Sequence, residues 1–404
     1  MNFQHQPILK PLKVVIVNPL TPASQLVIVK ILTGVIFGKK QLIDLIFVTS
    51  SNEMKSVDAF RLELESCAFP CTNSIKMSLD FSSTSEGDVF CFMTDFTNPN
   101  CLKFNKEDSE IEFKALNFMI KLAKSFTWSD DKNLSELDKK KLHFEKKKSK
   151  YKNIPVIKER KPVFLADGLL AMDILKSLSD NIPHDLIFCP SPITAIAKTV
   201  LGDYLSVQCD VINDVLVWAA NDEVFHVEVE KPLIINDFHC KSDIIGKDLL
   251  ESLNLDSTQF SAAWMKKEFI EKLCKKVASS ASKNPYGCIY RAAEFSKTLR
   301  DIWLTRIQDD VTKVYTNMGV ISDGSLGTIK GYPYILPIVM SKDSWSIDRR
   351  FEDDTHLKME IKRLNKMAKD QHVELISHCK NFLRENVIYQ AFRDEDDSGS
   401  TSKY

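Results

Sequence analysis

Short apolar runs of buried-strand length alternate with segments of helical periodicity through the first half of the chain. The runs are Val14–Val17, Leu42–Val48, Val89–Met93, Val163–Ala166, Leu186–Cys189 and Val215–Ala219. Apolar residues recur at helical spacing in Ala23–Leu32, Val57–Ala68 and Asn105–Ser125, and Gly34 and Pro70 end the first two segments. Uniformly apolar strands that alternate with helices predict a parallel sheet covered by helices.

The second half of the chain shows helices followed by a hairpin. Helical spacing covers Trp264–Ala281 and Tyr290–Trp303, and a glycine-rich loop joins two strand-like runs, Thr316–Val320 and Tyr334–Val339. A long helix is predicted over Asp354–Asn386. The two halves together predict an α/β fold, with a mostly parallel N-terminal lobe and an α+β C-terminal lobe.

The same patterns divide the chain into four parts. We expect an N-terminal extension over 1–12, a first domain over 13–190, a second domain over 191–390 and an acidic tail over 391–404. The tail is polar and rich in serine, so we expect it to be disordered.

The amino-acid composition narrows the class of protein. With 404 residues, 44% hydrophobic and 27% charged, the chain can bury a sizeable core. A formal charge of -1 argues against a surface that coats nucleic acid. Ten scattered cysteines without a CxxC pair indicate reduced thiols and no metal site. No apolar run reaches the roughly 20 residues of a membrane span, so we expect a cytoplasmic protein.

Lysines crowd the segment 127–161, which interrupts the first domain. The crowded positions are Lys139, Lys140, Lys141, Lys146, Lys147, Lys148, Lys150 and Lys152, with Glu145 as the only acid among them. The simpler interpretation is a solvated surface insertion. The alternative is a docking patch for an acidic partner, such as a cytoskeletal protein, RNA or an anionic lipid. The segment has too few interleaved aromatic residues to favour RNA among these partners.

Three stretches resemble the malate dehydrogenase family of the cytosolic type, and in particular its divergent 1B-like branch. Phe37–Gln41 with Arg61–Pro70 resembles the family segments FGKDQ and MELQDCALP, and Trp264–Phe269 with Leu299–Trp303 forms the second stretch. Met318–Gly324 reads MGVISDG, as the family does. The resemblance implies a lactate/malate dehydrogenase-like fold with a Rossmann-like first lobe, and a homodimer formed through the helix that contains Arg61.

The resemblance also implies hydride transfer between malate and NAD, which needs a base, a carboxylate to orient it, and arginines to clamp a dicarboxylate. Matching the family's WGNHS segment puts Asn221 at the position of the histidine base. Ungapped matching puts Ile193 and Ile196 at the orienting aspartate and a substrate arginine, and Asn98 lies in the substrate loop, which contains no arginine. Loss of a general base alone lowers rates by roughly 10² to 10⁴. We therefore predict an inactive family member.

The cofactor positions are altered as well. Pro19, Pro22 and Gln25 lie in the turn after the first strand, where the family has a glycine-rich phosphate cradle, and proline has no N–H to donate. Thr49 replaces the acid that binds the adenine ribose; with the following serines and Lys55 it would suit the 2′-phosphate of NADP better than NAD. We expect no cofactor.

Two functions remain open. The first is a scaffold or structural subunit of a cytoplasmic or cytoskeletal assembly. The alternative is a weak NAD(P)-dependent oxidoreductase that interconverts malate and oxaloacetate or a related 2-hydroxy acid, with His226 as the base and Asp222 or Glu223 orienting it. The alternation around His226 predicts a strand residue on the polar face, exposed or packed. Tyr290 falls near the nicotinamide position, where it either plugs the pocket or fills the core.

Overall fold

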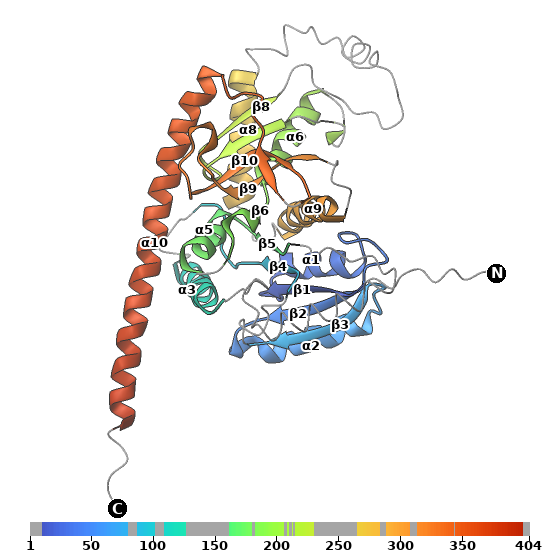
Figure 1. The fold of residues 1–404 in the computed structure, drawn as a ribbon, viewed down its shortest axis with the longest axis vertical. Helices are drawn as coiled ribbons and strands as arrows, with labels where there is room; N and C mark the ends of the chain where they lie inside the picture. Colours follow the sequence, from blue (N-terminus) through green and yellow to red (C-terminus); the bar gives the residue numbers. More distant parts are fainter. Residues whose placement is uncertain are drawn as a thin grey trace, which may run out of the picture.

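A single sheet runs through the protein (Figure 1). The computed structural model describes residues 10–79, 87–101, 109–126, 161–179, 182–205, 208–209, 212, 215–229, 265–282, 288–307, 313–342 and 344–398. Within these residues the strand order is β3-β2-β1-β4-β5-β6-β9-β10-β7-β8, and β11 pairs with β10. The lysine-rich patch Lys139–Lys152 lies outside the described residues.

The first half of the sheet is parallel, as predicted. Its strands are β1 (Leu12–Val17), β2 (Ile43–Val48), β3 (Thr72–Ser78), β4 (Val89–Phe92), β5 (Val163–Ala166) and β6 (Ile187–Cys189). All but β3 follow predicted apolar runs. Strand β3 was missed because it forms the sheet edge, where only Ile75 among its residues is buried.

Helices cover this parallel half. They are α1 (Pro22–Leu32), α2 (Met54–Ser66), α3 (Ser109–Ser125), α5 (Leu169–Leu178) and α6 (Pro192–Leu205), with short 3-10 turns η1 (Ser51–Glu53) and η4 (His184–Leu186). The predicted helices α1, α2 and α3 are confirmed within the described residues. Helix α5 was not predicted: eight of its ten residues are buried, and its polar face is a narrow one formed by Asp173, Lys176 and Ser177.

The second half of the sheet is antiparallel. The predicted hairpin is confirmed as β9 (Val314–Ile321) and β10 (Pro333–Met340), joined through the 3-10 turn η7 (Ser325–Gly327). Strand β6 pairs antiparallel with β9 and so joins the two halves. Strands β7 (Val215–Ala219), β8 (Phe225–Val229) and β11 (Trp345–Ile347) complete the sheet, beside the π-helical turn η6 (Met265–Phe269), α8 (Ile270–Ser282) and α9 (Cys288–Ile307).

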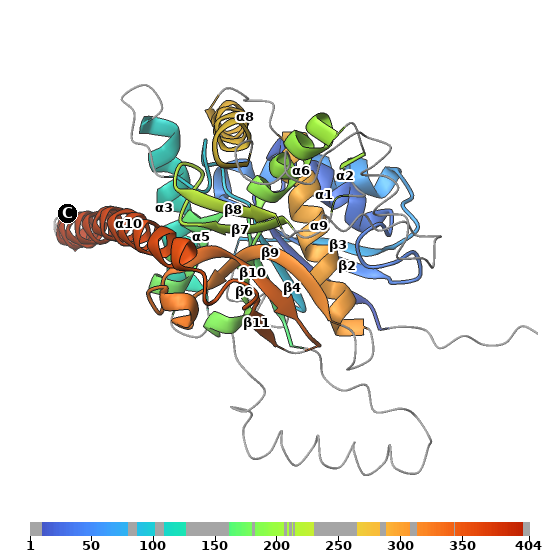
Figure 2. The same cartoon turned by 90° about the horizontal axis from the view of Figure 1, so that it is seen from above.

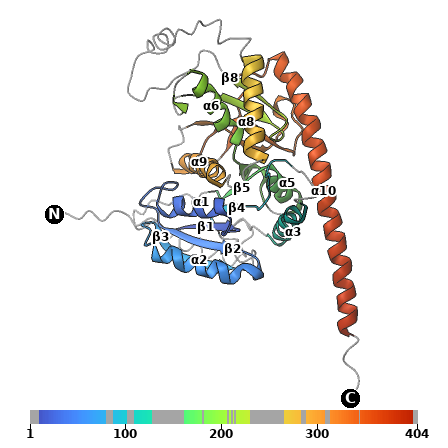
Figure 3. The same ribbon diagram turned by 180° about the vertical axis from the view of Figure 1, so that it is seen from behind.

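The last helix, α10 (Thr355–Ser398), has 44 residues and runs along one side of the molecule beyond its body (Figures 1 and 3). It contacts α3 and α5, whereas α1 and α9 pack together on the other side (Figure 2). We predicted a helix that ends at Asn386 and a disordered tail from residue 391. That boundary was wrong, because the helix continues to Ser398. None of the described helices has the length and apolar content needed to cross a membrane.

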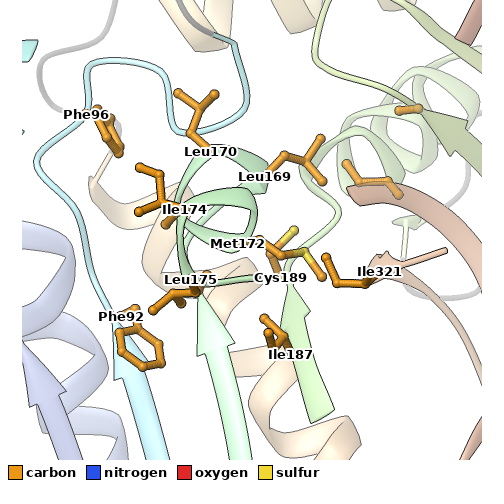
Figure 4. Packing of buried hydrophobic residues seen from close by; sticks show 14 of the residues in the cluster. Phe92, Phe96, Leu169, Leu170, Met172, Ile174, Leu175, Ile187, Cys189 and Ile321 are labelled. Atoms are coloured by element: carbon orange, nitrogen blue, oxygen red, sulfur yellow. The ribbon is translucent and has the colours of Figure 1, made fainter. Parts of the chain in front are cut away.

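The core lies on both faces of the sheet. Phe90 and Phe164 stack with ring centroids 4.9 Å apart on neighbouring strands. Figure 4 shows apolar side chains of α5 packed over β4 and β6 toward Ile321. Gly319 is required at this point, because a Cβ there would overlap the Sγ of Cys189. The close packing fixes the carboxyl ends of the parallel strands, where the candidate site lies.

Candidate functional site

A cavity of about 430 Å³ lies beyond the carboxyl ends of the parallel strands. Its walls come from the loop after β4, the first turn of α1, the start of α6 and the first turns of α9. In open α/β sheets, ligands bind in such a crevice. Of the positions predicted from the sequence, Pro22, Asn98, Ile193 and Ile196 line this cavity, and so does Tyr290. Asn221, Pro19, Gln25 and Thr49 do not.

The loop after β4 is fixed by its own hydrogen bonds. The Oδ1 atom of Asn98 accepts from the backbone N–H groups of Asn100, at 2.9 Å, and Cys101, at 3.2 Å. The guanidinium of Arg291 donates to the carbonyl of Phe96 at 3.1 Å and to that of Thr97. Asn98 therefore shapes the turn, and the loop is tied to α9.

The same loop packs closely against the start of α5. A Cβ at Gly168 would overlap the backbone of Pro99, so only glycine allows this approach. The Pro99 carbonyl accepts from the N–H of Leu170 at 3.0 Å, and the Oδ1 of Asn100 accepts from that of Leu169 at 3.0 Å. The first two N–H groups of α5 are thus occupied by the loop.

Asn221, at the predicted base position, has a structural role. Its side chain is 1% exposed. Its Oδ1 atom accepts from the N–H groups of Glu223 at 3.0 Å and Val224 at 2.8 Å. Its Nδ2 atom donates to Oε1 of Gln371 at 3.1 Å. The amide therefore holds the turn between β7 and β8 and joins it to α10.

Ile193 and Ile196, at the predicted orienting and clamping positions, form an apolar wall. Both lie in the first turns of α6, and they are 0% and 7% exposed. Neither can carry a charge or orient a base. The cavity wall that they form favours a hydrocarbon surface on any ligand.

Two carboxylates lie in the cavity wall, and of these Asp222 entered the sequence analysis only as a group that could orient His226. Asp167 follows β5 and accepts from the backbone N–H of Thr94 at 2.7 Å and from its hydroxyl at 2.8 Å. Asp222 follows β7 and accepts from Nδ2 of Asn100 at 3.2 Å. Burial raises the pKa of Asp167 to about 6 and that of Asp222 to about 6, although hydrogen bonds and Arg291 act in the opposite direction.

Tyr290 places its hydroxyl among these groups. The Oη atom is buried and has no hydrogen-bond partner within the described part of the chain. Burial raises the pKa of Tyr290 well above its usual value, and the nearby Asp222 raises it further. The residue lines the cavity.

The turn after β1 does not fit a dinucleotide pyrophosphate. Pro22 is the first residue of α1, and the Oγ1 of Thr21 caps the helix by accepting from the N–H of Ser24 at 3.2 Å. The side chain of Gln25 donates back to the carbonyl of Leu20 at 3.1 Å. The N–H of Ser24 and the amide of Gln25 are thus used within the turn, and Pro19 and Pro22 supply no N–H.

The end of β2 changes the expectation that the adenine ribose position suits NADP better than NAD. Thr49 is 3% exposed, and its hydroxyl donates to the Oε2 atom of Glu53 at 2.8 Å. A carboxylate therefore lies where matching found no acid, and it would repel the 2′-phosphate of NADP. The interpretation in favour of NADP was incomplete because Glu53 lies four residues beyond the matched position.

His226 is packed in strand β8, as one of the two sequence-based alternatives expected. It is 9% exposed, its Nε2 atom lies 2.8 Å from the Oε1 of Glu228, and its ring centroid is 5.8 Å from that of Trp218. It does not line the cavity. Among the residues described, no group of three or more His, Cys, Asp or Glu side chains is arranged to hold a metal.

No protein-family model matches the chain. Cytoplasmic malate dehydrogenase of Rattus norvegicus is 23% identical over 341 residues, which cover 83% of this chain and 88% of the rat protein. The human protein named "Putative malate dehydrogenase 1B" is 20% identical over 340 residues, which cover 84% of this chain and 58% of the human protein.

Solved structures give the same family of folds. Malate dehydrogenase of Naegleria fowleri superposes with a TM-score of 0.63 at 12% identity, covering 92% of this chain and 99% of the other. Lactate dehydrogenase of Trichomonas vaginalis in complex with NADH and oxamate superposes with a TM-score of 0.63 at 13% identity, covering 93% of this chain and 99% of the other. The chain has the lactate/malate dehydrogenase fold. Its sequence is similar to the cytoplasmic malate dehydrogenases and to the 1B protein, which confirms the predicted resemblance.

Proposed function

We propose that this chain is a malate dehydrogenase-like protein that has lost malate dehydrogenase activity and serves as a scaffold or structural subunit in the cytoplasm. The observation that carries the proposal is the state of Asn221. Both ends of its amide are engaged in hydrogen bonds that shape the fold. An amide at this place cannot accept the proton that malate oxidation releases.

The substrate clamp supports the same proposal. Arg291 is the only lysine or arginine among the described residues that line the cavity. Two of its five N–H groups donate to loop carbonyls, which holds the guanidinium against the loop. A dicarboxylate would meet Asp95, Asp167 and Asp222 instead, and like charges in a buried site repel. The cavity therefore does not suit malate or oxaloacetate.

A second copy of the chain is the partner that we propose first. Helix α1 exposes Leu26 and Val29, and α2 exposes Leu62, at 37%, 38% and 51% of their surfaces. Apolar side chains exposed on these helices suit a homodimer interface. Light scattering of the Leu62→Asp variant checks this, with Met359→Asp, also exposed, as the control on α10. Dimer loss in both variants, or in neither, would contradict the proposed interface.

The lysine-rich patch Lys139–Lys152 supports a further proposed partner, an acidic surface such as that of a cytoskeletal protein. The support is its charge alone. Microtubule co-sedimentation is expected to fall when its eight lysines are replaced by glutamine. Equal sedimentation of both forms would reject this partner.

Isothermal titration tests the loss of cofactor binding. NAD, NADH, NADP and NADPH are each titrated into the full chain. For each we expect a Kd above about 1 mM, because the turn after β1 has few donors for the pyrophosphate. Micromolar binding of any of the four would overturn the proposal.

A second candidate function rests on one observation at Asp222. This carboxylate lines the cavity next to the matched base position, and burial raises its pKa to about 6, which suits a general base at neutral pH. The alternative is then a weak NAD-dependent oxidoreductase for a 2-hydroxy acid, with Glu53 on the adenine side. Activity that Asp222→Asn abolishes, and that the exposed Asp203→Asn control leaves intact, would favour it.

A further inference from the structure

Six cations follow one side of the C-terminal helix α10. Successive residues of an α-helix turn by about 100°, so positions three, four and seven apart share a face. The six positions fall within a sector of about 80° by this rule, and all are exposed. They are Lys358, Lys362, Lys366, Lys369, Lys380 and Arg384. At 1.5 Å per residue, this basic stripe is about 39 Å long.

The acids of the same stretch lie on another side of the helix. Arg363, outside the sector, pairs with Glu360 at 2.7 Å. Within the described part of the chain, no side chain of the basic stripe forms an ion pair or a hydrogen bond. The acids outside the sector are Glu360, Asp370, Glu374 and Glu385. The positive charge of the stripe is therefore free to meet a partner.

The basic stripe is unfavourable for the helix alone. Like charges four residues apart destabilise a helix, whereas opposite charges at that spacing stabilise it. The like-charged steps of four residues are Lys358 to Lys362, Lys362 to Lys366 and Lys380 to Arg384. A negative partner would relieve this repulsion, so the pattern indicates binding rather than helix stability.

The basic stripe faces away from the body of the protein. The helix lies along the outer edge of the molecule in each view (Figures 1, 2 and 3). Its opposite side packs into the core through Leu357, Ile361, Leu364, Ala368, Leu375 and Cys379. A flat surface can therefore touch the stripe along its length.

A straight line of charge fits a plane better than a groove. The major groove of DNA is about 12 Å wide and winds around the duplex, so a straight helix backed by the protein body cannot follow it over the whole stripe. A cluster of four to eight cations on a helix is typical of binding to anionic lipids. Val373 lies within the stripe and is 53% exposed, and helices at membrane interfaces carry such apolar side chains beside their lysines.

We propose that the basic stripe of α10 docks on a membrane surface that contains anionic phospholipids, with its ammonium groups at the lipid headgroups. The contact is peripheral and electrostatic. This inference goes beyond the proposed function, because the stripe does not line the cavity and its contact needs neither cofactor nor substrate.

Vesicle co-sedimentation of the full chain tests the proposal. Vesicles of phosphatidylcholine with about 30% phosphatidylserine are compared with vesicles of phosphatidylcholine alone, in about 0.1 M salt. We expect at least about tenfold tighter binding to the anionic vesicles. This binding should be lost in about 1 M salt, where charges are screened beyond about 3 Å.

Variants locate the contact on α10. The double variant Lys362→Gln with Lys366→Gln should weaken binding to the anionic vesicles about tenfold, because each lysine near such a surface contributes to the attraction. The double variant Lys272→Gln with Lys275→Gln makes the same change of net charge at exposed positions of α8. This control should bind as the wild type does.

Equal binding to both kinds of vesicle, unchanged binding of the α10 variant, or an equal loss in the α8 variant would each overturn the inference. A DNA duplex and poly-L-glutamate are measured at the same concentration of charge. Tighter binding of either than of the anionic vesicles would also overturn it, by assigning the stripe to nucleic acid or to an acidic protein. None of these results bears on the loss of cofactor binding, which its own titration tests.

Discussion

The Nδ2 atom of Asn221 donates to the Oε1 atom of Gln371 at 3.1 Å. Gln371 lies in α10, and its own Nε2 atom donates to the carbonyl of Asn100 at 3.1 Å. Two amides therefore connect the turn after β7, the loop after β4 and the C-terminal helix. At the place where the related enzymes are expected to carry a base, this chain has a structural junction.

Asn221→His is expected to destabilise the protein without producing activity. The imidazole cannot accept from the N–H groups of both Glu223 and Val224, and it must fit a site that is 1% exposed. We expect the free energy of unfolding to fall by about 2–4 kcal/mol. Urea denaturation measures this, and Asn52→His at an exposed position should change it by less than about 0.5 kcal/mol. A stable variant that reduces oxaloacetate would contradict the structural role.

Asp222 should give the protein a dependence of stability on pH. Its pKa is raised to about 6 by burial, above the usual aspartate value, so the folded state favours the neutral carboxyl group. Its contribution is fully present at low pH and is lost as the pH rises through about 6. Relative to the wild type, Asp222→Asn should gain about 2 kcal/mol between pH 4.5 and pH 7.

Thermal unfolding across this pH range measures the difference between wild type and variant. Asp203→Asn, which removes an exposed carboxylate, is the control and should follow the wild type at every pH. If the Tm of Asp222→Asn differs from that of the wild type by the same amount at every pH, the carboxyl group is not desolvated and the account of the cavity is wrong.

Arg291→Gln should release the loop after β4. The guanidinium donates to the carbonyls of Phe96 and Thr97, and no shorter side chain can reach both. Amide hydrogen exchange at Asn100 and Cys101 is expected to quicken about tenfold, which corresponds to about 1.4 kcal/mol of local stability. The control is Arg300→Gln, an exposed position of the same helix. Unchanged exchange in the Arg291 variant would show that the loop is held by its own turn alone.

Gly319→Ala should strain the junction between the two halves of the sheet. The added methyl group would overlap Sγ of Cys189 on the paired strand β6. We expect a loss of about 1–3 kcal/mol in the free energy of unfolding. Cys189→Ala in the same chain should recover part of that loss, so a double-mutant cycle should show favourable coupling. Additive losses would place the strain elsewhere.

Much of the fold follows from the sequence because buried parallel strands are uniformly apolar. Strands β5 and β7 have the residue bounds that were predicted. Helix α5 was not recognised, since eight of its ten residues are buried and only Asp173, Lys176 and Ser177 form a polar face. The end of α10 was misplaced because charged residues such as Asp394 and Glu395 indicate solvent exposure, which a projecting helix satisfies as well as a disordered tail does.

The site was predictable only where motifs could be matched. Of the positions matched to family segments, Ile193 and Ile196 line the cavity and Asn221 does not. Asp167 could have been found, because it directly follows the apolar run of β5, where the carboxyl ends of parallel strands meet. The contact of Arg291 with Phe96 joins residues 195 positions apart, and no local pattern in the sequence records it.

The most direct test of the central claim is a single-turnover measurement of NADH oxidation by oxaloacetate, with the full chain in excess over NADH. With Asn221 held in structural hydrogen bonds, and with Arg291 tied to the loop after β4 as the only lysine or arginine among the described cavity residues, we predict no oxidation beyond the rate in buffer alone. Oxaloacetate-dependent oxidation that Asp222→Asn abolishes and Asp203→Asn does not would show that the chain is an enzyme, and would contradict the account.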